Sequence, residues 1–234
     1  MNLSKSLEFF DPLNQIDAPI HIIGIGAMGS RVAELLARLG VRQMHVWDMD
    51  TVEDKNIANQ AYFNRHIGMP KVDALEDLLM DINPQIKINK HGEYKSQPIA
   101  GYIFLCVDSI ELRYNIAKNN ELNPNIKAMF DTRMRLTDAQ SYAADWSNKA
   151  QKNFFLNSMS FTDEEAQEAT PVSACGTTLS VASTVVSTAA FTVSNFINLI
   201  RDSKCKEAIF TDAFAHTIIN LTNLYYILFN RFIH

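Results

Sequence analysis

A short apolar run leads directly into three closely spaced glycines, and this arrangement constrains the possible fold more than any other part of the chain. Residues 21–25 are mainly apolar and β-branched, and Gly24, Gly26 and Gly29 follow the pattern G-x-G-x-x-G. From Ser30 to Leu39 the apolar residues recur at the spacing of one helix face. The sequence therefore predicts a strand, a tight turn and a helix in direct succession.

The three glycines of this loop have different physical tasks. Gly24 permits the tight turn, Gly26 lets backbone N–H groups approach a phosphate, and Gly29 lets the helix pack closely on the strand. The first turn of the helix adds unpaired N–H groups and the positive end of the helix dipole. We therefore expect an anion-binding site at this loop. A glycine-rich connection that binds no ligand is the alternative interpretation.

A second apolar strand is predicted over Met44–Trp47, and it ends at an acidic residue, Asp48. In a Rossmann fold, an acid at the end of this strand accepts hydrogen bonds from the ribose of a bound nucleotide. The glycine loop and Asp48 together therefore indicate a nucleotide-binding domain. An enzyme that uses NAD would satisfy all of these features.

The residues after Asp48 favour a nucleotide triphosphate over NAD. They add an acid, two amides and a cation, namely Asp50, Asn56, Gln60 and Lys71. A cation beside paired amides suits a triphosphate better than a pyrophosphate that a helix N-terminus already holds. Lys71 opens a helix predicted over Val72–Ile82, where a cation is mildly disfavoured, so its position favours a function. An ordinary solvated lysine is the alternative interpretation.

Two further strands are predicted, over Tyr102–Val107 and Lys127–Phe130, and they end at Asp108 and Asp131. Ser109 can cap the helix that follows the first of them. The alternation of strands and helices from residue 21 to residue 131 predicts an α/β fold with a doubly wound parallel sheet. Because the carboxyl ends of parallel strands lie at one edge, the glycine loop and the acids that follow the strands should converge there.

The rest of the chain carries weaker patterns. Segments 208–211 and 217–232 suggest another strand and a final apolar element. Leu179–Ile200 has no charged residue and is long enough to span a bilayer, but its many serine, threonine and asparagine residues favour a buried helix over a membrane span. We expect an N-terminal arm over residues 1–20 and a single domain over residues 21–234.

Composition and charge exclude several classes of protein. A chain of 234 residues, of which 47% are hydrophobic, is long enough for one well-buried domain. The net charge is −5 and the basic residues do not cluster, so a nucleic-acid groove is not expected. Three widely spaced cysteines argue against a disulfide framework or a structural zinc site. The first residues lack the apolar core of a signal peptide, which favours a cytoplasmic location.

Taken together, the motifs resemble those of the ThiF/MoeB/HesA family, the adenylating domains related to ubiquitin-activating enzymes. The resemblance is good over about the first 135 residues and weaker over the remainder. The residues that carry it are Gly24-Ile25-Gly26-Ala27-Met28-Gly29, Asp48-Met49-Asp50, Asn56, Gln60, Gly68-Met69-Pro70-Lys71, Asn83-Pro84 and Cys106-Val107-Asp108-Ser109.

This resemblance implies a ThiF-type fold, Rossmann-like and doubly wound, with a mainly parallel sheet whose later strands are antiparallel. It implies an enzyme that binds ATP and Mg²⁺ and adenylates the C-terminal carboxylate of a small ubiquitin-like protein or peptide, usually as a homodimer. Carried over by position, Asp48 would hold the ribose, Asn56 and Lys71 the phosphates, and Asp108 the metal ion. The other residues implied at the cofactor site are Gly24, Gly26, Met28, Gly29, Asp50, Asn59 and Gln60.

One position departs from the family pattern. The family reads S-N-L-x-R-Q where this chain reads K-N-I-A-N-Q, so Asn59 stands at the position of an arginine. An arginine there would stabilise charge that develops on the phosphates, which an amide cannot do. Arg65, a few residues later, is a candidate replacement in this catalytic role. Chains with N-Q at this point, and with a run like Asp131–Met134, resemble a phage- and mobile-element-associated branch of the family.

Two later features are read through the same resemblance. In the family, the region corresponding to 147–171 crosses over the active site and holds the peptide tail, although the acidic residues 163–168 on their own suggest a solvated helix or loop. Cys175 precedes the predicted long helix, whose dipole can favour a thiolate. Related activating enzymes use a cysteine from this region for a thioester, whereas free cysteines are usually inert core residues.

Three hypotheses follow for the function. The first is an ATP-dependent adenylyltransferase that acts on a carboxylate. The second, motivated by Asn59, is a catalytically impaired protein of the same family that serves as a nucleotide-binding or dimeric scaffold. The third is an NAD-dependent oxidoreductase, which is disfavoured by Lys71 and Asp108 and by the absence of an evident pair of acid and base for hydride transfer.

Overall fold

The computed structural model describes residues 1–173 and 179–221. The strands are β1 (Ile20–Ile23), β2 (Gln43–Trp47), β3 (Lys87–His91), β4 (Gly101–Leu105), β5 (Ile126–Met134), β6 (Asp138–Asp145), β7 (Ala208–Asp212) and β8 (Thr217–Leu221). The α-helices are α1 (Pro12–Gln15), α2 (Ala27–Arg38), α3 (Lys71–Ile82), α4 (Ile110–Asn119), α5 (Lys149–Asn157), α6 (Asp163–Glu168) and α7 (Ala182–Asp202). Two short 3₁₀ turns, η1 (Asp54–Asn56) and η2 (Asn64–His66), precede α3.

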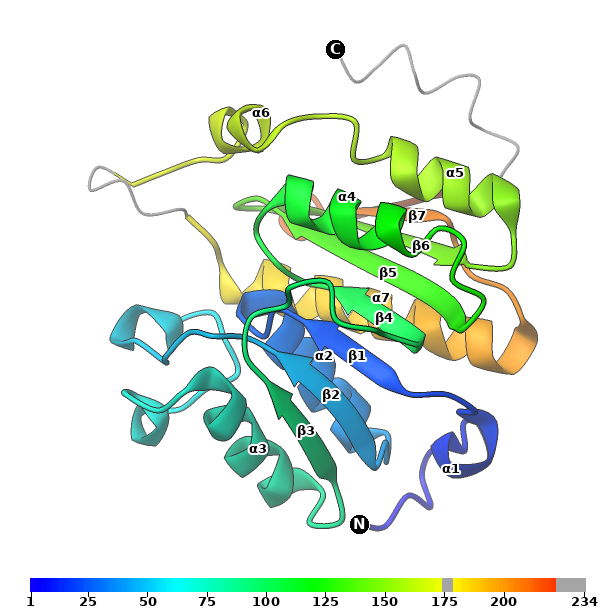
Figure 1. Cartoon of the computed structure of the whole chain (residues 1–234). Coiled ribbons are helices and arrows are strands. Elements are labelled where there is room, and N and C mark those ends of the chain that lie inside the picture. The colour runs from blue at the N-terminus through cyan, green and yellow to red at the C-terminus, as the bar shows by residue number, and fades with distance from the viewer. Residues whose placement is uncertain (174–178, 222–234) are drawn as a thin grey trace.

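All of the described strands belong to one sheet, in the order β3-β2-β1-β4-β5-β6-β7-β8 (Figure 1). The pairs among β1 to β5 are parallel, and the pairs from β5 to β8 are antiparallel. This mixed sheet with helices confirms the predicted doubly wound α/β fold. The strand order reverses beside β1, between β2 and β4, and ligands of such sheets bind at that point. The glycine loop leaves β1 there.

The sheet differs from the sequence prediction in its middle. β5 does not end before Asp131 but continues to Met134, because the antiparallel strand β6 pairs with it as far as that residue. The sequence patterns also missed β3 and β6. β3 is a short polar edge strand, and β6 contains no β-branched residue, so neither has the apolar alternation that marks a strand. Of the predicted final element 217–232, the described part is β8.

The buried strands feed two core layers because their side chains alternate between the faces of the sheet. Ile22 and Phe104 join the core beneath α2, α3 and α7. Ile23 and Leu105, their neighbours in the chain, join the core beneath α4 and α5. Figure 1 shows the two sets of helices on opposite faces of the sheet. Near-continuous apolar runs are therefore required in β1 and β4, which are buried on both sides.

The long helix α7 is a core element of this fold. It is the one described helix that is long and apolar enough to cross a membrane, but half of its apolar stretch is buried in the structure. It packs against α2 and against β5 and β6 (Figure 1). Its buried hydroxyl groups are satisfied: Thr188 donates to the carbonyl of Thr184, and Thr192 donates to the carbonyl of Thr188. This packing supports the prediction of a buried helix rather than a membrane span.

Three histidines stack across the parallel half of the sheet. His21, His45 and His91 stand on β1, β2 and β3, and the ring centroids of His21 and His45 lie 4.4 Å apart. The indole N–H of Trp47 donates to Nδ1 of His21 over 3.2 Å, so this nitrogen is an unprotonated acceptor. Burial, with smaller contributions from His45 and His91, lowers the pKa of His21 to about 4. His21 is therefore neutral in the folded protein at neutral pH.

This stack predicts a pH dependence of stability. The ordinary pKa of histidine is 6.5 and the folded value of His21 is about 4, so the unfolded chain binds more protons between these values. The free energy of unfolding should therefore fall as the pH falls from about 6.5 towards 4. Asn at position 21 can still accept from Trp47 but does not titrate, so His21→Asn should reduce this slope in urea unfolding. His216→Asn, at an exposed histidine, is the control and should retain the slope; equal slopes in all three proteins would contradict the assignment.

Candidate functional site

The glycine loop that follows β1 is a point of close contact between backbones. Gly24 has a φ of +85°, and a Cβ atom there would lie 2.7 Å from the carbonyl oxygen of Cys106 at the end of β4. A Cβ atom on Gly29, in the first turn of α2, would lie 1.9 Å from the carbonyl oxygen of Gly24. The structure thus gives both residues the steric reasons that the sequence predicted: a strained turn and close helix packing.

Gly26 differs because open space lies beside it. The nearest atom to a Cβ at this position would be Nε2 of Gln60, at 4.0 Å. Gln60 is only 8% exposed, and its Oε1 has no hydrogen-bond partner among the residues that the structure describes. An acceptor oxygen cannot bind a phosphate, but the amide nitrogen of Gln60 beside Gly26 can donate to one. An open glycine at a helix N-terminus, beside this donor, fits a bound nucleotide phosphate.

Side chains from outside the loop hold it in this conformation. Asp48 accepts a hydrogen bond from the backbone N–H of Ile25 over 2.9 Å, and the hydroxyl of Tyr62 donates to the Ile25 carbonyl over 2.8 Å. Ser30, fully buried, accepts from the N–H of Ala61. The sequence patterns singled out neither Tyr62 nor Ser30, because a tyrosine or a serine near such a motif carries no specific signal. Their contacts fix the loop before any ligand arrives.

Lys71 lies against the acids at the end of β2. Its Nζ lies 2.7 Å from Oδ2 of Asp50 and 3.8 Å from Oδ2 of Asp48. The side chains of Lys71 and Asp48 are almost buried, whereas that of Asp50 is 58% exposed. A bridge between Thr51 and Pro70 brings the start of α3 to this point. A polyphosphate that arrives here would compete with an exposed carboxylate for an ammonium group that is already in position.

The two asparagines of the predicted site make local contacts. Oδ1 of Asn56 accepts from the backbone N–H of Glu53 over 2.8 Å and so caps η1. Nδ2 of Asn59 donates to the hydroxyl of Ser180, just before α7. The residue at the family's arginine position thus bonds to the segment between α6 and α7. Met28 is buried in the core beneath the loop, and its contact with a cofactor stays a prediction.

Arg65 is not brought to the glycine loop. Its guanidinium group pairs with Asp77 at 3.2 Å and Asp81 at 2.7 Å, both on α3, and lies over the ring of Phe63. The side chain is half exposed and lines a cavity of about 630 Å³ between α2 and α3. Arg31, at the same cavity, pairs with Glu34. The catalytic role of Arg65 stays a prediction, and it requires release from both carboxylates.

Asp108 lies on the turn after β4. The backbone of this turn is held by hydrogen bonds, whereas the Asp108 carboxylate has no partner among the described residues. The side chain is exposed, and no residue in the described part of the chain forms a hydrogen bond or an ion pair with it. The buried guanidinium of Arg113 reaches back from α4 and donates to the carbonyls of Leu105 and Val107. An exposed carboxylate on an anchored turn can bind a cation without prior loss of another partner.

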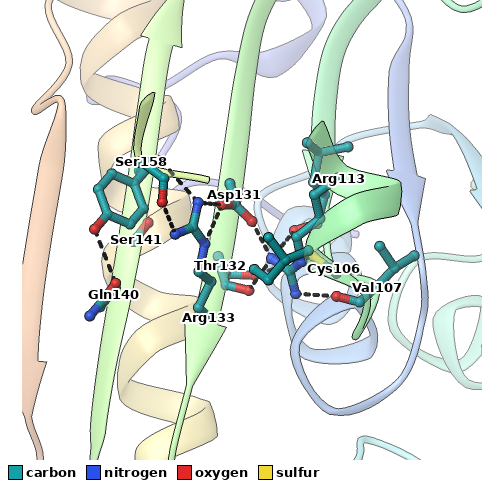
Figure 2. A network of polar contacts seen from close by, with 12 residues as sticks. Cys106, Val107, Arg113, Asp131, Thr132, Arg133, Gln140, Ser141 and Ser158 are labelled. Carbon is teal, nitrogen blue, oxygen red and sulfur yellow. Dashed lines mark hydrogen bonds and ion pairs between the residues drawn. The ribbon is translucent and has the colours of Figure 1, made fainter. Parts of the chain in front are cut away.

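Arg113, which holds the turn after β4, also belongs to a buried network of ion pairs (Figure 2). Asp131 is fully buried on β5 and lies between Arg113 and Arg133. Burial alone would raise the pKa of Asp131, but the two guanidinium groups outweigh it and hold this pKa below its usual range. Arg113 also donates to the carbonyl of Thr132, and Arg133 donates to both the carbonyl and the hydroxyl of Ser158. The network therefore joins β4, α4, β5 and the end of α5.

A metal ion at this site would depend mainly on Asp108. Among residues 1–173 and 179–221, no group of three or more histidine, cysteine or acidic residues could hold a metal ion. Mg²⁺ typically binds to one or two carboxylates together with substrate phosphates and waters, so Asp108 fits a metal that arrives with a nucleotide. Cys175, the predicted reactive thiol, lies outside the described residues.

Comparisons with known proteins identify a matching family and several relatives. The model of the ThiF family matches residues 15–224. Ubiquitin-like modifier-activating enzyme 5 of Caenorhabditis briggsae is 32% identical over 126 residues, which are 45% of this chain and 29% of the relative. Molybdopterin-synthase adenylyltransferase of Salmonella typhimurium is 31% identical over 115 residues, which are 46% of this chain and 44% of the relative. The chain thus matches less than half of the length of these curated relatives.

Solved structures extend the likeness to most of the chain. E. coli MccB with ATP has a TM-score of 0.66 and 16% identity, with 89% of this chain and 64% of that chain covered. PaaA has a TM-score of 0.65 and 17% identity, with 88% of this chain and 64% of that chain covered. At these identities the likeness establishes a common fold.

The glycine loop yields a stability prediction. Gly29→Ala should lower the free energy of unfolding by about 3 kcal/mol, because the new Cβ would overlap the backbone of Gly24. Gly26→Ala should change it by less than about 1 kcal/mol, because only an amide nitrogen at 4.0 Å faces the new methyl group. Urea unfolding of the two variants beside the parent protein measures the difference. Equal losses would show that the space beside Gly26 is not open.

Proposed function

The chain belongs to the ThiF family, and on this premise we propose that it binds ATP with Mg²⁺ and adenylates a carboxylate at the C-terminus of a small protein or peptide. The observation that carries the proposal is the open side of Gly26 at the N-terminus of α2, where the nearest atom to an added Cβ would be the donor Nε2 of Gln60, at 4.0 Å. A nucleotide phosphate would lie at the N-terminus of α2 and could bridge to the amide of Gln60. Lys71 stands nearby as a buried cation.

Each residue of the site would contribute one interaction with the nucleotide. Asp48 would accept hydrogen bonds from the ribose with the lone pairs that its contacts with backbone N–H groups leave free. Lys71 would exchange its ion pair with Asp50 for the phosphates. Asn56 would donate from its amide nitrogen, and Asp108 would hold the metal ion. Bound with ATP, Mg²⁺ supplies positive charge that neutralises the phosphate oxygens.

The proposed reaction needs no general base. The substrate carboxylate is ionised at neutral pH, and one of its oxygens forms a bond to the α-phosphorus of ATP. The bond from the α-phosphorus to the oxygen that bridges to the β-phosphorus breaks, and pyrophosphate leaves with the electron pair. The chain's own residues align the two reactants and stabilise the charge that develops on the phosphates.

The substrate class is inferred from the relatives. One is named a ubiquitin-like modifier-activating enzyme, and MccB, a microcin C7 biosynthetic enzyme, has been solved with N-formylated MccA. We extend this to a small ubiquitin-like protein or a peptide with a free C-terminus. We also propose a homodimer formed through the later helices, including the small-residue helix α7, a cytoplasmic location, and membership of the phage- and mobile-element-associated branch.

A second candidate function rests on Asn59. The amide bonds to Ser180 and cannot stabilise phosphate charge as an arginine would. A catalytically impaired protein that binds the nucleotide and acts as a scaffold is therefore the alternative.

Two measurements on one preparation separate the hypotheses. Calorimetric titration with ATP and Mg²⁺, and separately with NAD, should give heat for ATP alone; binding of NAD without ATP would support an oxidoreductase. Exchange of pyrophosphate into ATP is then measured with candidate peptides that end in a free carboxylate, and with the same peptides amidated as the matched control. Exchange that needs the free carboxylate supports the adenylyltransferase. ATP binding without exchange for any peptide favours the scaffold.

Lys71→Ala should weaken the binding of ATP more than that of AMP, because the lysine is assigned to phosphates that AMP lacks. A hydrogen bond to a charged group contributes about 1.5–3 kcal/mol, so the ratio of the two affinities should fall roughly tenfold or more. Titration calorimetry with both nucleotides measures this ratio. Lys55→Ala, at an exposed lysine paired with Glu53, is the control and should leave it unchanged. Equal losses for ATP and AMP would give Lys71 a role in the fold instead.

Asn59→Arg tests whether the departure at this position weakens phosphate binding. A guanidinium group close to the phosphates should raise the affinity for ATP roughly tenfold while the affinity for AMP changes little. The same substitution breaks the bond to Ser180, so Ser180→Ala serves as the control that removes this contact without adding charge. An Asn59→Arg protein that binds ATP no better than Ser180→Ala would show that the side chain at 59 does not face the phosphates.

A further inference from the structure

The turn that carries Asp108 is held from a second side by a residue far away in the sequence. Asp163, the first residue of α6, accepts a hydrogen bond from the hydroxyl of Ser109 over 2.7 Å and from the backbone N–H of Ile110 over 2.5 Å. The N–H of Glu111 lies within 3.4 Å of the same carboxylate. The acidic segment 163–168 is therefore not simply solvated, because its first member docks on the N-terminus of α4.

This contact completes the cap of α4. The first N–H groups of a helix lack partners within the helix, and the positive end of the dipole favours an anion there. Ser109 accepts from the N–H of Leu112 and donates its own proton to Asp163. The serine hydroxyl thus lies between the helix and the carboxylate. Both residues are needed to satisfy the first turn of α4.

The backbone on both sides of Asp108 is consequently fixed. On the preceding side, Arg113 binds the carbonyl of Val107, and Asp131 holds Arg113 in place. On the following side, Asp163 binds Ser109 and the N–H of Ile110. The Asp108 carboxylate between these anchors has no hydrogen-bond or ion-pair partner in the described chain. Side chains in a functional site need such support if they are to keep a productive geometry without partners of their own.

We propose that Asp163 is a positioning residue for Asp108, which it holds in the direction required by a metal ion that enters with a nucleotide. The inference rests on the proposed function, because it assigns a role to Asp163 only if Asp108 meets Mg²⁺. Asp163 itself does not touch the ligand. Helix α6 thereby takes part in metal binding through the peptide backbone next to Asp108.

The test compares the binding of ATP with Mg²⁺ and of ATP with EDTA by calorimetry. In the parent protein Mg²⁺ should strengthen binding, and Asp108→Asn should remove this gain. Asp163→Ala should weaken binding in Mg²⁺ roughly tenfold, the size typical of residues that support a metal ligand, and should leave binding in EDTA unchanged. Glu164→Ala removes the neighbouring exposed acid of α6 and should match the parent in both conditions.

A second readout checks that the contact itself is lost. Exchange of the Ile110 amide proton, followed by NMR, should accelerate in Asp163→Ala and not in Glu164→Ala. Asp163→Asn keeps one neutral oxygen as acceptor and should fall between the parent and Asp163→Ala in both measurements. A graded response in exchange and in the Mg²⁺-dependent part of binding is the expected result.

The outcomes are separable. If the parent protein does not bind ATP, the proposed function fails, and the role of Asp163 fails with it. If the parent and Asp108→Asn behave as expected but Asp163→Ala keeps the full gain from Mg²⁺, only the role of Asp163 is overturned. If Asp163→Ala weakens binding equally in Mg²⁺ and in EDTA, Asp163 supports the fold in general, and the positioning role is likewise overturned.

Discussion

The contact among three backbones at the end of β1 is the constraint on which the rest of the site depends. Gly24 lies against the end of β4, and Gly29 lies against Gly24. Any side chain at either position would push α2 or β4 away from β1. The parallel strands could still form, but the helix N-terminus, the acids after β2 and the turn after β4 would no longer face one space. The positions of Asp48, Lys71 and Asp108 relative to one another therefore follow from the absence of two methyl groups.

Among the residues that the structure describes, the charged side chains around this space are paired with opposite charges, except for Asp108. Lys71 is paired with Asp50, and Arg113 and Arg133 share the buried Asp131. Leaving one member of the buried group around Asp131 alone costs about 3–5 kcal/mol, so Arg113 and Arg133 stay where they are. Asp108 is the charged residue of the site that lacks a partner among those described. The Asp108 carboxylate can therefore bind a cation, and Lys71 can exchange its exposed partner Asp50 for an anion.

The sequence patterns predicted the features of the site that neighbouring residues along the chain determine. The glycine loop and the acid after β2 were found because each follows an apolar run, and Lys71 was found because it precedes the helical pattern of α3. The predicted end of β5 was wrong because pairing with β6 determines where β5 ends, and β6 has no clear sequence pattern of its own. The contacts of Asn59 with Ser180 and of Asp163 with Ser109 escaped prediction for the same reason. They join segments that are far apart in the chain, and no local periodicity encodes such a pair.

The histidine stack includes a tryptophan, Trp47, whose fluorescence depends on its surroundings. Trp47 comes one residue before Asp48, and its indole ring is buried against His91 and at the edge of Tyr94. Indole emission responds to the polarity and charge around the ring, and protonated imidazole quenches it. The chain thus carries an intrinsic fluorophore at the end of β2, next to the acid that we propose binds a ribose. The second tryptophan, Trp146, packs against Phe155 in the layer of α4 and α5, and it offers an internal reference.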